Sequence, residues 1–394
     1  MGPARDFAHN RAMPTPAHPH RPLPLLGGLT PAQFMRRHWQ KRPLLIRAAL
    51  PGFVPPLSRA RLFALARSAD VESRLVARTG RGAWRLAHGP FTRTALPLPT
   101  RPRWTLLVQG VDLHDERVRD LLATFRFVPD ARLDDVMISW ASDGGGVGPH
   151  VDSYDVFLLQ AHGRRRWRIA KRFDPTLRSD APLKVLRRFS AEREHLLEPG
   201  DMLYLPPGWA HDGEAEGGDC MTYSIGFRAP RRAELAAELV ERLLDRHASD
   251  ESPLYRDPRQ TATRTPARVP APLREFAAAA ARELVASRRE LGRVLGETLT
   301  KPKAHVQFDT RPQRGRTAAV ALDRRTSMLY DDAHLFINGQ SHLVAGKDAA
   351  LLRRLADRRR LDAPAVRGAS AGARALLRAW LRAGWLRRGA RARR

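Results

Sequence analysis

The sequence contains a single cysteine, Cys220, among 394 residues. One cysteine cannot form a disulfide within the chain, and such usage is typical of a reducing compartment, so we expect a cytoplasmic protein. The sequence also lacks a run of about 18 apolar residues that could span a membrane. Residues 1–24 have no apolar signal-peptide core and are rich in Pro, His and Arg. We therefore expect a disordered leader and no membrane partner.

Lysine is scarce as well, although the chain is strongly basic. The formal net charge is +28, and only six of the 69 basic residues are lysines, which leaves 63 arginines. A genome whose codon usage favours arginine would explain this skew. Attraction to an acidic partner, most simply rRNA or a ribosomal particle, would explain it equally well, because a positive field speeds such encounters. Charge alone leaves both explanations open.

The remaining composition, with 43% hydrophobic residues, is that of a globular protein. We divide the chain into a leader (1–24), a mixed region (25–230), a helical region (231–303) and a C-terminal region (304–394). In the second region a helix should begin after Thr30, with Pro31 in its first turn. Loops rich in Gly, Pro and Asp then separate short apolar segments, which predict a barrel or jelly roll within an α+β fold. These segments are "DDVMISWAS", "DVFLLQAHG", "RRWRIAK", "DMLYLPP" and "MTYSIGF".

Helices are expected from about residue 231. Leu235, Leu239 and Leu243 recur at steps of four, which places them on one stripe of a helix that could cover the barrel or a second copy of the chain. The C-terminal region mixes strand-like and helical segments in an order that suits a winged-helix-like module. Residues 351–394 carry fourteen arginines against two aspartates. This basic segment is either a solvated face or a contact with RNA or an acidic partner.

A short motif at the start of one strand, "GPHVDSYDVF", places His150 and Asp152 two positions apart. Strand side chains alternate between faces, so both should project to the same side, with Tyr154 continuing that face. An unpaired carboxylate inside a barrel would cost several kcal/mol, and a divalent metal would neutralise it. A His-x-Asp pair also arises often by chance as a surface ion pair or a cap.

A second motif, "GDMLYLPPGWAH", supplies a third candidate ligand at His211. Its Pro206-Pro207-Gly208 turn should fix the loop that carries this histidine. Two histidines and one aspartate form the facial triad of non-haem Fe(II) oxygenases, which leaves metal positions open for a cosubstrate and O₂. We therefore predict a catalytic metal site at His150, Asp152 and His211.

These motifs, together with "VFLLQAHGRRRW", resemble the JmjC-type 2-oxoglutarate oxygenases, and among them the bacterial ribosomal oxygenases. The resemblance is strong over about 130–230 and looser in the helical and C-terminal regions. It implies a double-stranded β-helix (cupin) barrel, a helical dimerisation segment, a winged-helix-like domain and a homodimer. It also implies Fe(II) as cofactor, 2-oxoglutarate and O₂ as cosubstrates, and succinate and CO₂ as products. The implied substrate is an arginine of large-subunit ribosomal protein L-sixteen, hydroxylated at its β-carbon.

The family binds the distal carboxylate of 2-oxoglutarate through a basic residue fifteen positions after the first histidine, which is Arg165 here. A guanidinium suits this role because it binds a carboxylate in a bidentate fork. Alternation should turn Arg164 and Arg166 toward solvent, although a solvated position for all three arginines is an alternative.

Four further residues are candidates for contacts in this site. Tyr154 and Ser224 could hydrogen-bond to the cosubstrate, with core packing as the alternative for each. Asp143 and Asp155 could pair with a cationic substrate side chain, with a solvated loop or edge position as the alternative.

Two other functions compete with this assignment. The oxygenase could act on another protein residue or on RNA. Alternatively, the barrel could be a catalytically inactive cupin-like factor that binds RNA or assists ribosome assembly. The complete set of His150, Asp152, His211 and Arg165 argues against an inactive protein.

Overall fold

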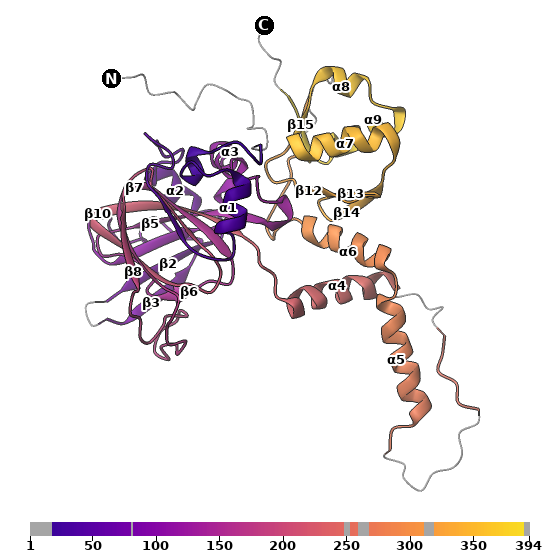
Figure 1. Ribbon diagram of the computed structural model, residues 1–394, viewed down its shortest axis with the longest axis horizontal. Coiled ribbons are helices and arrows are strands. Elements are labelled where there is room, and N and C mark those ends of the chain that lie inside the picture. The colour runs from indigo at the N-terminus through magenta and orange to yellow at the C-terminus, as the bar shows by residue number, and fades with distance from the viewer. Residues whose placement is uncertain (1–17, 80–81, 248–252, 259–267, 311–318, 390–394) are drawn as a thin grey trace.

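The computed structural model describes residues 18–79, 82–247, 253–258, 268–310 and 319–389. Three of the segments outside these residues matter for the predictions. They are most of the predicted leader, parts of the predicted helical region (248–252 and 259–267) and the basic end 390–394. Figure 1 shows a β-barrel flanked by short helices, a group of three helices, and a small C-terminal domain. Within the described chain, no helix combines the length and the apolar character that crossing a bilayer requires.

The first part of the chain builds the barrel and the helices that cover it. Its helices are α1 (Pro31–Arg37), α2 (Arg59–Leu65) and α3 (Glu116–Ala123). Its strands are β1 (Leu44–Ile46), β2 (Ser73–Arg78), β3 (Trp84–His88), β4 (Trp104–Val108), β5 (Leu133–Ala141), β6 (His150–Val151), β7 (Asp155–Ala170), β8 (Arg193–Leu197), β9 (Met202–Leu205) and β10 (Ala210–Phe227).

Helix α1 begins where the sequence predicts. The Thr30 hydroxyl accepts from the Gln33 amide, and the Gln33 side chain accepts from the Thr30 amide, which completes a capping box. Pro31 occupies the first turn, where its missing N–H costs nothing. Phe34 on this helix is fully buried and packs on Phe157 and Tyr204 of the barrel, so the cap also fixes how the helix meets the sheet.

All ten strands belong to one antiparallel sheet, in the order β1-β9-β7-β10-β5-β4-β2-β3, with β6 on β10 and β8 on β7. The predicted strand segments are all present. However, "DVFLLQAHG" and "RRWRIAK" form one continuous strand, β7, rather than two. Gly163, where the two segments meet, has a φ of +61°. From the sequence alone this glycine indicates a break between two strands.

The two faces of β7 serve different cores. Phe157 and Leu159 point into the large core beneath the N-terminal helices. Val156 and Leu158 point the other way, into a smaller core that also holds Trp167. The smaller core is completed by Ile169, Leu197, Leu203, Leu205 and Trp209. It lies on the face of the sheet that carries His211 and therefore forms the walls of the candidate site.

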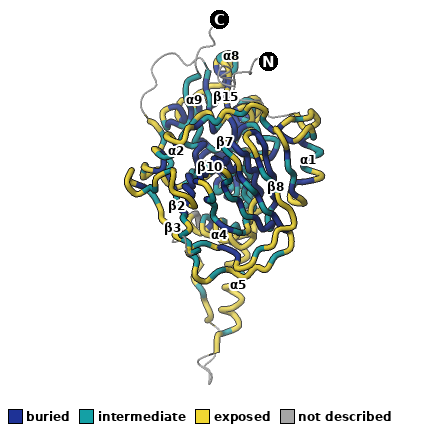
Figure 2. The backbone as a smooth tube through the Cα atoms, turned by 90° about the vertical axis from the view of Figure 1, so that its left-hand side faces the viewer, coloured by how far each residue is buried: buried dark blue, intermediate teal, exposed yellow. Residues whose placement is uncertain are grey.

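Three helices follow the barrel: α4 (Arg232–His247), α5 (Ala271–Val285) and α6 (Arg288–Thr300). Helix α6 packs on the C-terminal domain, where Gly296 lies so close to Phe336 that an added Cβ would fall 2.4 Å from that ring. Helix α5 has no buried residue and points away from the rest of the molecule (Figures 1 and 2).

The C-terminal domain contains helices and short strands in an alternating order. Its elements are β11 (Val320–Leu322), β12 (Met328–Tyr330), β13 (His334–Ile337), β14 (Gln340–Leu343), α7 (Gly346–Arg358), β15 (Arg360–Leu361), α8 (Ala363–Arg367), α9 (Ala371–Arg382) and β16 (Leu386–Arg388). Leu352, Leu377 and Trp380 lie in its core. The order α7-β15-α8-α9-β16 is that of a winged helix, as predicted.

Polar contacts hold this domain against the barrel. Lys303, just after α6, lies 2.8 Å from the Asp134 carboxylate of β5. Arg126 donates to the carbonyls of Ala356 and Asp357 at the end of α7, at 3.1 and 2.5 Å. Arg324 donates to the Leu113 carbonyl at 2.6 Å. The C-terminal domain therefore has a defined position on the barrel.

Candidate metal centre and cosubstrate pocket

The three predicted metal ligands come from two paired strands, β6 and β10, and from the turn that follows β6. His150 in β6 pairs directly with His211 in β10. Asp152 follows in the turn between β6 and β7, where its carbonyl accepts from the Gly208 amide at 3.0 Å. The sequence predicts one strand running on from His150 and a loop position for His211. Instead the strand is interrupted at Asp152, and His211 lies within β10.

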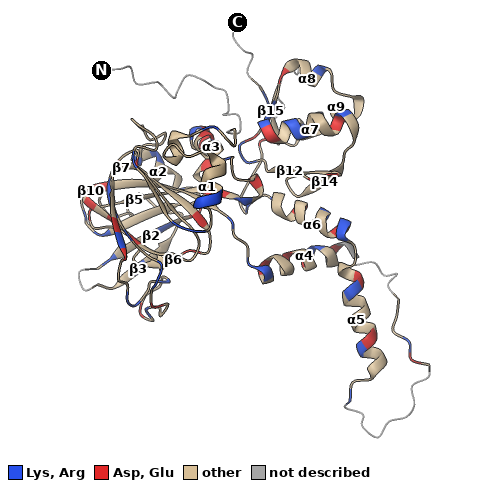
Figure 3. Cartoon of the chain, viewed as in Figure 1, with Lys and Arg blue, Asp and Glu red and all other residues tan. Residues whose placement is uncertain are grey.

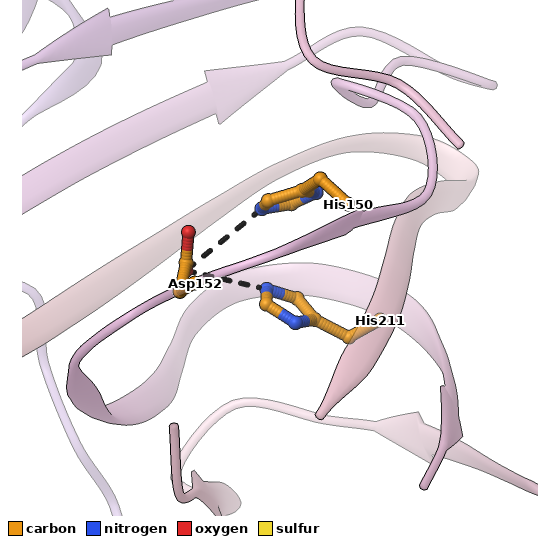
Figure 4. A group of neighbouring side chains, drawn as sticks. All are labelled: His150, Asp152 and His211. Carbon is orange, nitrogen blue, oxygen red and sulfur yellow. Dashed lines mark ion pairs between the residues drawn. The ribbon is translucent and has the colours of Figure 1, made fainter. Parts of the chain in front are cut away.

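The ligand atoms of these side chains converge. One nitrogen or oxygen from each of His150, Asp152 and His211 lies within 4.8 Å of the others. The Asp152 carboxylate is 3.9 Å from His150 Nε2 and 3.5 Å from His211 Nε2, and Figure 4 shows the three groups facing one another. The predicted triad is therefore one cluster in space.

Hydrogen bonds at the rear of each imidazole fix its orientation. His150 Nδ1 lies 2.8 Å from the Gly148 carbonyl, and His211 Nδ1 lies 3.0 Å from the Trp209 carbonyl. A carbonyl only accepts, so each Nδ1 carries the proton and each Nε2 keeps its lone pair toward the cluster. Gly148 holds a φ of +78°, and a Cβ there would lie 2.8 Å from the Trp84 ring, so this close approach requires glycine.

His211 is also held in its neutral form. Burial, and secondarily the neighbouring His150, lower the pKa of His211 to about 4. A neutral imidazole is the form that binds a metal. Two imidazole nitrogens and a carboxylate oxygen on one side of a site suit a divalent first-row metal. The donor set thus fits the metal that the sequence predicts.

Arg165 lies inside the barrel and is only 3% exposed. Its guanidinium donates to the Ser139 hydroxyl at 3.3 Å and to the Gly213 carbonyl at 3.0 Å, and its Nε has no partner in the described part of the chain. None of its described neighbours supplies a carboxylate as an ion-pair partner. A buried cation without an anion is costly, which is the situation expected where a ligand carboxylate binds.

A tryptophan connects this arginine with the metal cluster. The Trp167 ring lies 4.9 Å from the Arg165 guanidinium and 5.9 Å from the His211 ring. All three side chains extend from the paired strands β7 and β10 toward the smaller core. Arg165 and the candidate metal site therefore lie on the same face of the sheet, on either side of Trp167.

The neighbouring arginines of β7 point outward, as alternation predicts. Arg166 pairs with Glu216 and Glu194, and Arg168 pairs with Glu194 at 3.2 Å and with Glu214 at 3.3 Å. These ion pairs run along the outer surface of the barrel. Their charges are satisfied there, which separates them from the unpaired Arg165 on the inner face.

Tyr154 and Ser224 border the pocket in different ways. Tyr154 is 38% exposed, and burial of its hydroxyl and a hydrogen bond to Asp152 raise the pKa of its phenol. Ser224 is buried on β10 opposite Leu158, which belongs to the pocket wall. Both remain predictions as cosubstrate contacts.

The two candidate substrate carboxylates differ in their exposure. Asp155 is fully buried, accepts from Tyr204 at 2.6 Å and from Gln40 at 3.0 Å, and pairs with Arg132 at 3.2 Å. With its oxygens engaged in the core, it cannot reach a substrate, so that prediction is wrong. Asp143 is exposed and accepts from the Gly218 amide at 3.0 Å, and its contact with a substrate remains a prediction.

Sequence reasoning missed the residues that hold Arg165. Ser139 lies on β5 and Gly213 on β10, far from Arg165 in the chain. A Cβ at Gly213 would fall 2.6 Å from Trp167 and 2.7 Å from Arg165 Nε, so only glycine leaves room for both side chains. The sequence feature that could have identified Gly213 is its position two residues after His211, which places both on the same face of a strand.

Comparison with known proteins gives two family matches. Residues 120–235 match the JmjC domain family, and residues 283–387 match the ROXA-like winged helix family. Over 226 residues the chain is 42% identical to the ribosomal protein uL16 3-hydroxylase of Escherichia coli strain K12, covering 57% of this chain and 59% of that protein. It is 37% identical over 212 residues to a probable ribosomal oxygenase of Haemophilus influenzae, covering 52% of each. These alignments thus span between half and three-fifths of the length of the relatives.

Solved structures match over a greater length. The X-ray structure of E. coli YcfD superposes with a TM-score of 0.80 at 31% identity, covering 91% of this chain and 98% of that one. A structure of the same E. coli ribosomal oxygenase in complex with cobalt and 2-oxoglutarate superposes with a TM-score of 0.76 at 30% identity, with the same coverage. The predicted fold, a JmjC-type barrel followed by a winged-helix domain, is confirmed.

Proposed function

Because the chain belongs to the JmjC-domain ribosomal oxygenases, we propose that it is an Fe(II)- and 2-oxoglutarate-dependent hydroxylase of ribosomal protein uL16, the L-sixteen of the sequence prediction. The reaction consumes 2-oxoglutarate and O₂ and yields succinate, CO₂ and a hydroxylated side chain. One O₂ oxygen enters the substrate and the other enters succinate. The observation that carries this proposal is the buried Arg165, which has no carboxylate partner among the described residues and lies on the same sheet face as the His150, Asp152 and His211 cluster.

The metal ligands would be His150 Nε2, a carboxylate oxygen of Asp152 and His211 Nε2. Iron bound there would supply O₂ activation and the oxidative decarboxylation of 2-oxoglutarate. The carbonyls of Gly148 and Trp209 hold the two imidazole rings, so the Nε2 atoms keep their direction whether or not a ligand is present. The histidine and aspartate donors come from one face, which leaves the opposite side of the site for cosubstrates.

Arg165 would bind the distal carboxylate of 2-oxoglutarate. Its guanidinium already donates hydrogen bonds to Ser139 and Gly213, so the side chain loses little conformational freedom when 2-oxoglutarate binds. Burial strengthens the attraction, because water does not screen the charge. Trp167, Ile169 and Leu203 line the same side of the sheet and exclude water from the reacting groups.

The substrate residue is the finer part of the proposal. The family resemblance implies hydroxylation at the β-carbon of an arginine. Because Asp155 is engaged in the core, the substrate guanidinium must be recognised by groups other than that carboxylate. We place the reaction in the cytoplasm, where ribosomes are assembled.

A homodimer is the second part of the proposal. Leu244 on α4 is 53% exposed and Phe276 on α5 is 39% exposed. Other large apolar side chains on the same two helices are also exposed, namely Val240, Leu273 and Val285. A second copy of these helices would cover them, and exposed apolar patches of this kind mark interaction surfaces. Residues 231–303 would then form the dimerisation segment.

Incubation with purified uL16, Fe(II), 2-oxoglutarate and air, followed by peptide mass analysis, tests the function. We expect the mass of one oxygen atom on a single arginine-containing peptide, with one succinate released for each modified substrate. Asp152→Ala should abolish both signals, whereas Asp180→Ala, which removes an exposed carboxylate that pairs with Arg178, should retain them. Succinate release without uL16 modification would redirect the assignment to another protein residue or to RNA.

An inactive cupin-like RNA-binding factor is the competing function. The basic composition favours it, but the oriented imidazoles and the unpaired Arg165 do not. A factor of that kind would bind RNA and give no succinate with any ribosomal substrate, and substitution of Asp152 would leave its function unchanged.

A further inference from the structure

The C-terminal domain contains a helix-turn-helix. Helix α8 ends at Arg367, and α9 begins at Ala371 after a three-residue turn. Ser370 caps α9 by accepting from the Ala373 amide at 3.0 Å. Two helices joined by a short glycine-containing turn are the usual frame in which the second helix is presented to a nucleic acid.

Helix α9 has two contrasting faces. Ala373, Leu377, Trp380 and Leu381 are buried in the domain core. The opposite face consists only of arginine, alanine and glycine: Ala371, Gly372, Arg374, Ala375, Arg378, Ala379 and Arg382, all exposed. The three arginines follow one another at steps of four and form a single ridge, which we call the α9 arginine ridge (Arg374, Arg378 and Arg382).

The ridge is not neutralised by acidic neighbours. No carboxylate in the described chain pairs with Arg378 or Arg382, and Arg374 donates only to the Ala369 carbonyl. Residues 346–389 contain twelve basic residues and three aspartates. Those aspartates accept from Ser370, Tyr330 and the Ala365 amide. Asp348 lies beside Gly372 at the N-terminal end of α9, and the other two accept from groups outside that helix. Figure 3 shows Lys and Arg together with a few acidic residues on the winged-helix domain.

We propose that the α9 arginine ridge binds the phosphate backbone of RNA. Each guanidinium can hold a phosphate in a bidentate fork. Ala375 and Ala379 beside the ridge are exposed and have only a methyl side chain, so a phosphate backbone can approach the helix closely there. The face carries no aromatic residue on which an unpaired base could stack, and the major groove of an RNA duplex is too deep and narrow for the arginines to read base edges, so binding is independent of sequence.

This surface gives the enzyme a second means of finding its substrate. A ribosomal protein is itself basic and repels a chain of net charge +28. Contact with the RNA around that protein reverses the sign of the long-range field and raises the encounter rate. The choice of RNA over DNA rests on the proposed ribosomal substrate, whereas the choice of a polyphosphate backbone rests on the ridge alone.

Fluorescence anisotropy of the full-length protein with a labelled RNA duplex, in the absence of iron and 2-oxoglutarate, tests the proposal. The affinity should fall steeply as salt concentration rises. Arg374→Ala, Arg378→Ala and Arg382→Ala combined should weaken binding about tenfold or more and flatten the salt dependence by about one phosphate contact for each arginine removed. Replacing the same three arginines with lysine should preserve most of the affinity.

The control removes three exposed arginines of the barrel part, Arg61, Arg67 and Arg93, and changes net charge equally. We expect it to bind RNA almost as the unaltered protein does. An equal loss in this control would show that the charge is a diffuse solvated surface and would overturn the proposal. Tighter binding to a DNA duplex of the same sequence, or equal competition by polyglutamate, would overturn it in favour of DNA or of an acidic protein. Because the assay involves no turnover, its failure is distinct from failure of the hydroxylase assignment.

Discussion

Arg165 differs from every other arginine of its strand in having a buried charge and no carboxylate partner among the described residues. Arg165→Lys keeps the charge but loses the fork and the bonds to Ser139 and Gly213. We expect the KM for 2-oxoglutarate to rise about 10- to 100-fold, since charged hydrogen bonds contribute about 1.5–3 kcal/mol each. Arg166→Lys, on the outer face of the same strand, should leave that KM unchanged. Equal effects in both variants would contradict the assigned role.

Gly213 controls the same arginine from the neighbouring strand. In Gly213→Ala the new methyl group would lie 2.7 Å from Arg165 Nε and 2.6 Å from the Trp167 ring, so both side chains must shift. We expect weaker 2-oxoglutarate binding by calorimetry, with Fe(II) binding retained. Gly226→Ala is the matched control, because a Cβ there has no neighbour nearer than 3.7 Å. Unchanged 2-oxoglutarate affinity in Gly213→Ala would show that the arginine does not set it.

The sequence was sufficient to identify the residues of the cluster but not their surroundings. His150, Asp152, His211 and Arg165 follow from two motifs and one fixed spacing, because these side chains carry the chemistry. Ser139 acts only through a contact between strands distant in the chain, so no local pattern marks it, and Gly213 was marked only by its position two residues after His211. Asp155 was misassigned because its neighbours Tyr204 and Gln40 become visible only in the folded protein.

At the scale of elements, helices with caps and periodic apolar residues were predicted well. Thr30 caps α1, and the stripe through Leu239 and Leu243 lies on α4. Strand continuity was predicted less well, since Gly163 in β7 marks a local left-handed residue and not an end. The strands β2, β3, β4 and β8 were not predicted individually, because their stability depends on pairing with distant strands rather than on local pattern.

At the scale of elements, we predict that α4 and α5 form the contact between two copies of the chain. Leu244→Glu combined with Phe276→Glu places charge on the two exposed apolar faces and should convert a dimer into a monomer, as measured by light scattering after size exclusion. Leu98→Glu, which alters a still more exposed leucine of the barrel part, should leave the mass unchanged. A monomeric unaltered protein at the same concentration would contradict the proposed dimerisation segment.

At the scale of the whole molecule, Lys303 connects the helical segment to the barrel by pairing with Asp134 and lying 3.8 Å from Asp135. Burial raises the pKa of Asp135 to about 6. Burial alone would also raise the pKa of Asp134, but Lys303 and Arg228 hold that pKa below its usual value. Ionisation of Asp135 therefore lowers the free energy of unfolding as the pH rises from about 4 to about 6, and Lys303 limits this loss.

Lys303→Met should lower the free energy of unfolding by about 2 kcal/mol at about pH 8, because two carboxylates lose their cation. The loss should be smaller at about pH 5, where Asp135 is largely protonated while Asp134 is still ionised. Denaturant titrations at the two pH values measure this difference. Lys301→Met, two residues away at an exposed position, is the control and should change neither value. A loss independent of pH would mean that Lys303 acts by packing alone.

The convergence of His150, Asp152 and His211 on one metal is most directly tested by anaerobic calorimetric titration of the metal-free protein with Fe(II). We predict one equivalent of Fe(II) bound by the unaltered protein and by Asp180→Asn, and no measurable binding by Asp152→Asn at the same concentrations. Equal binding of iron by Asp152→Asn and by the unaltered protein would contradict the account.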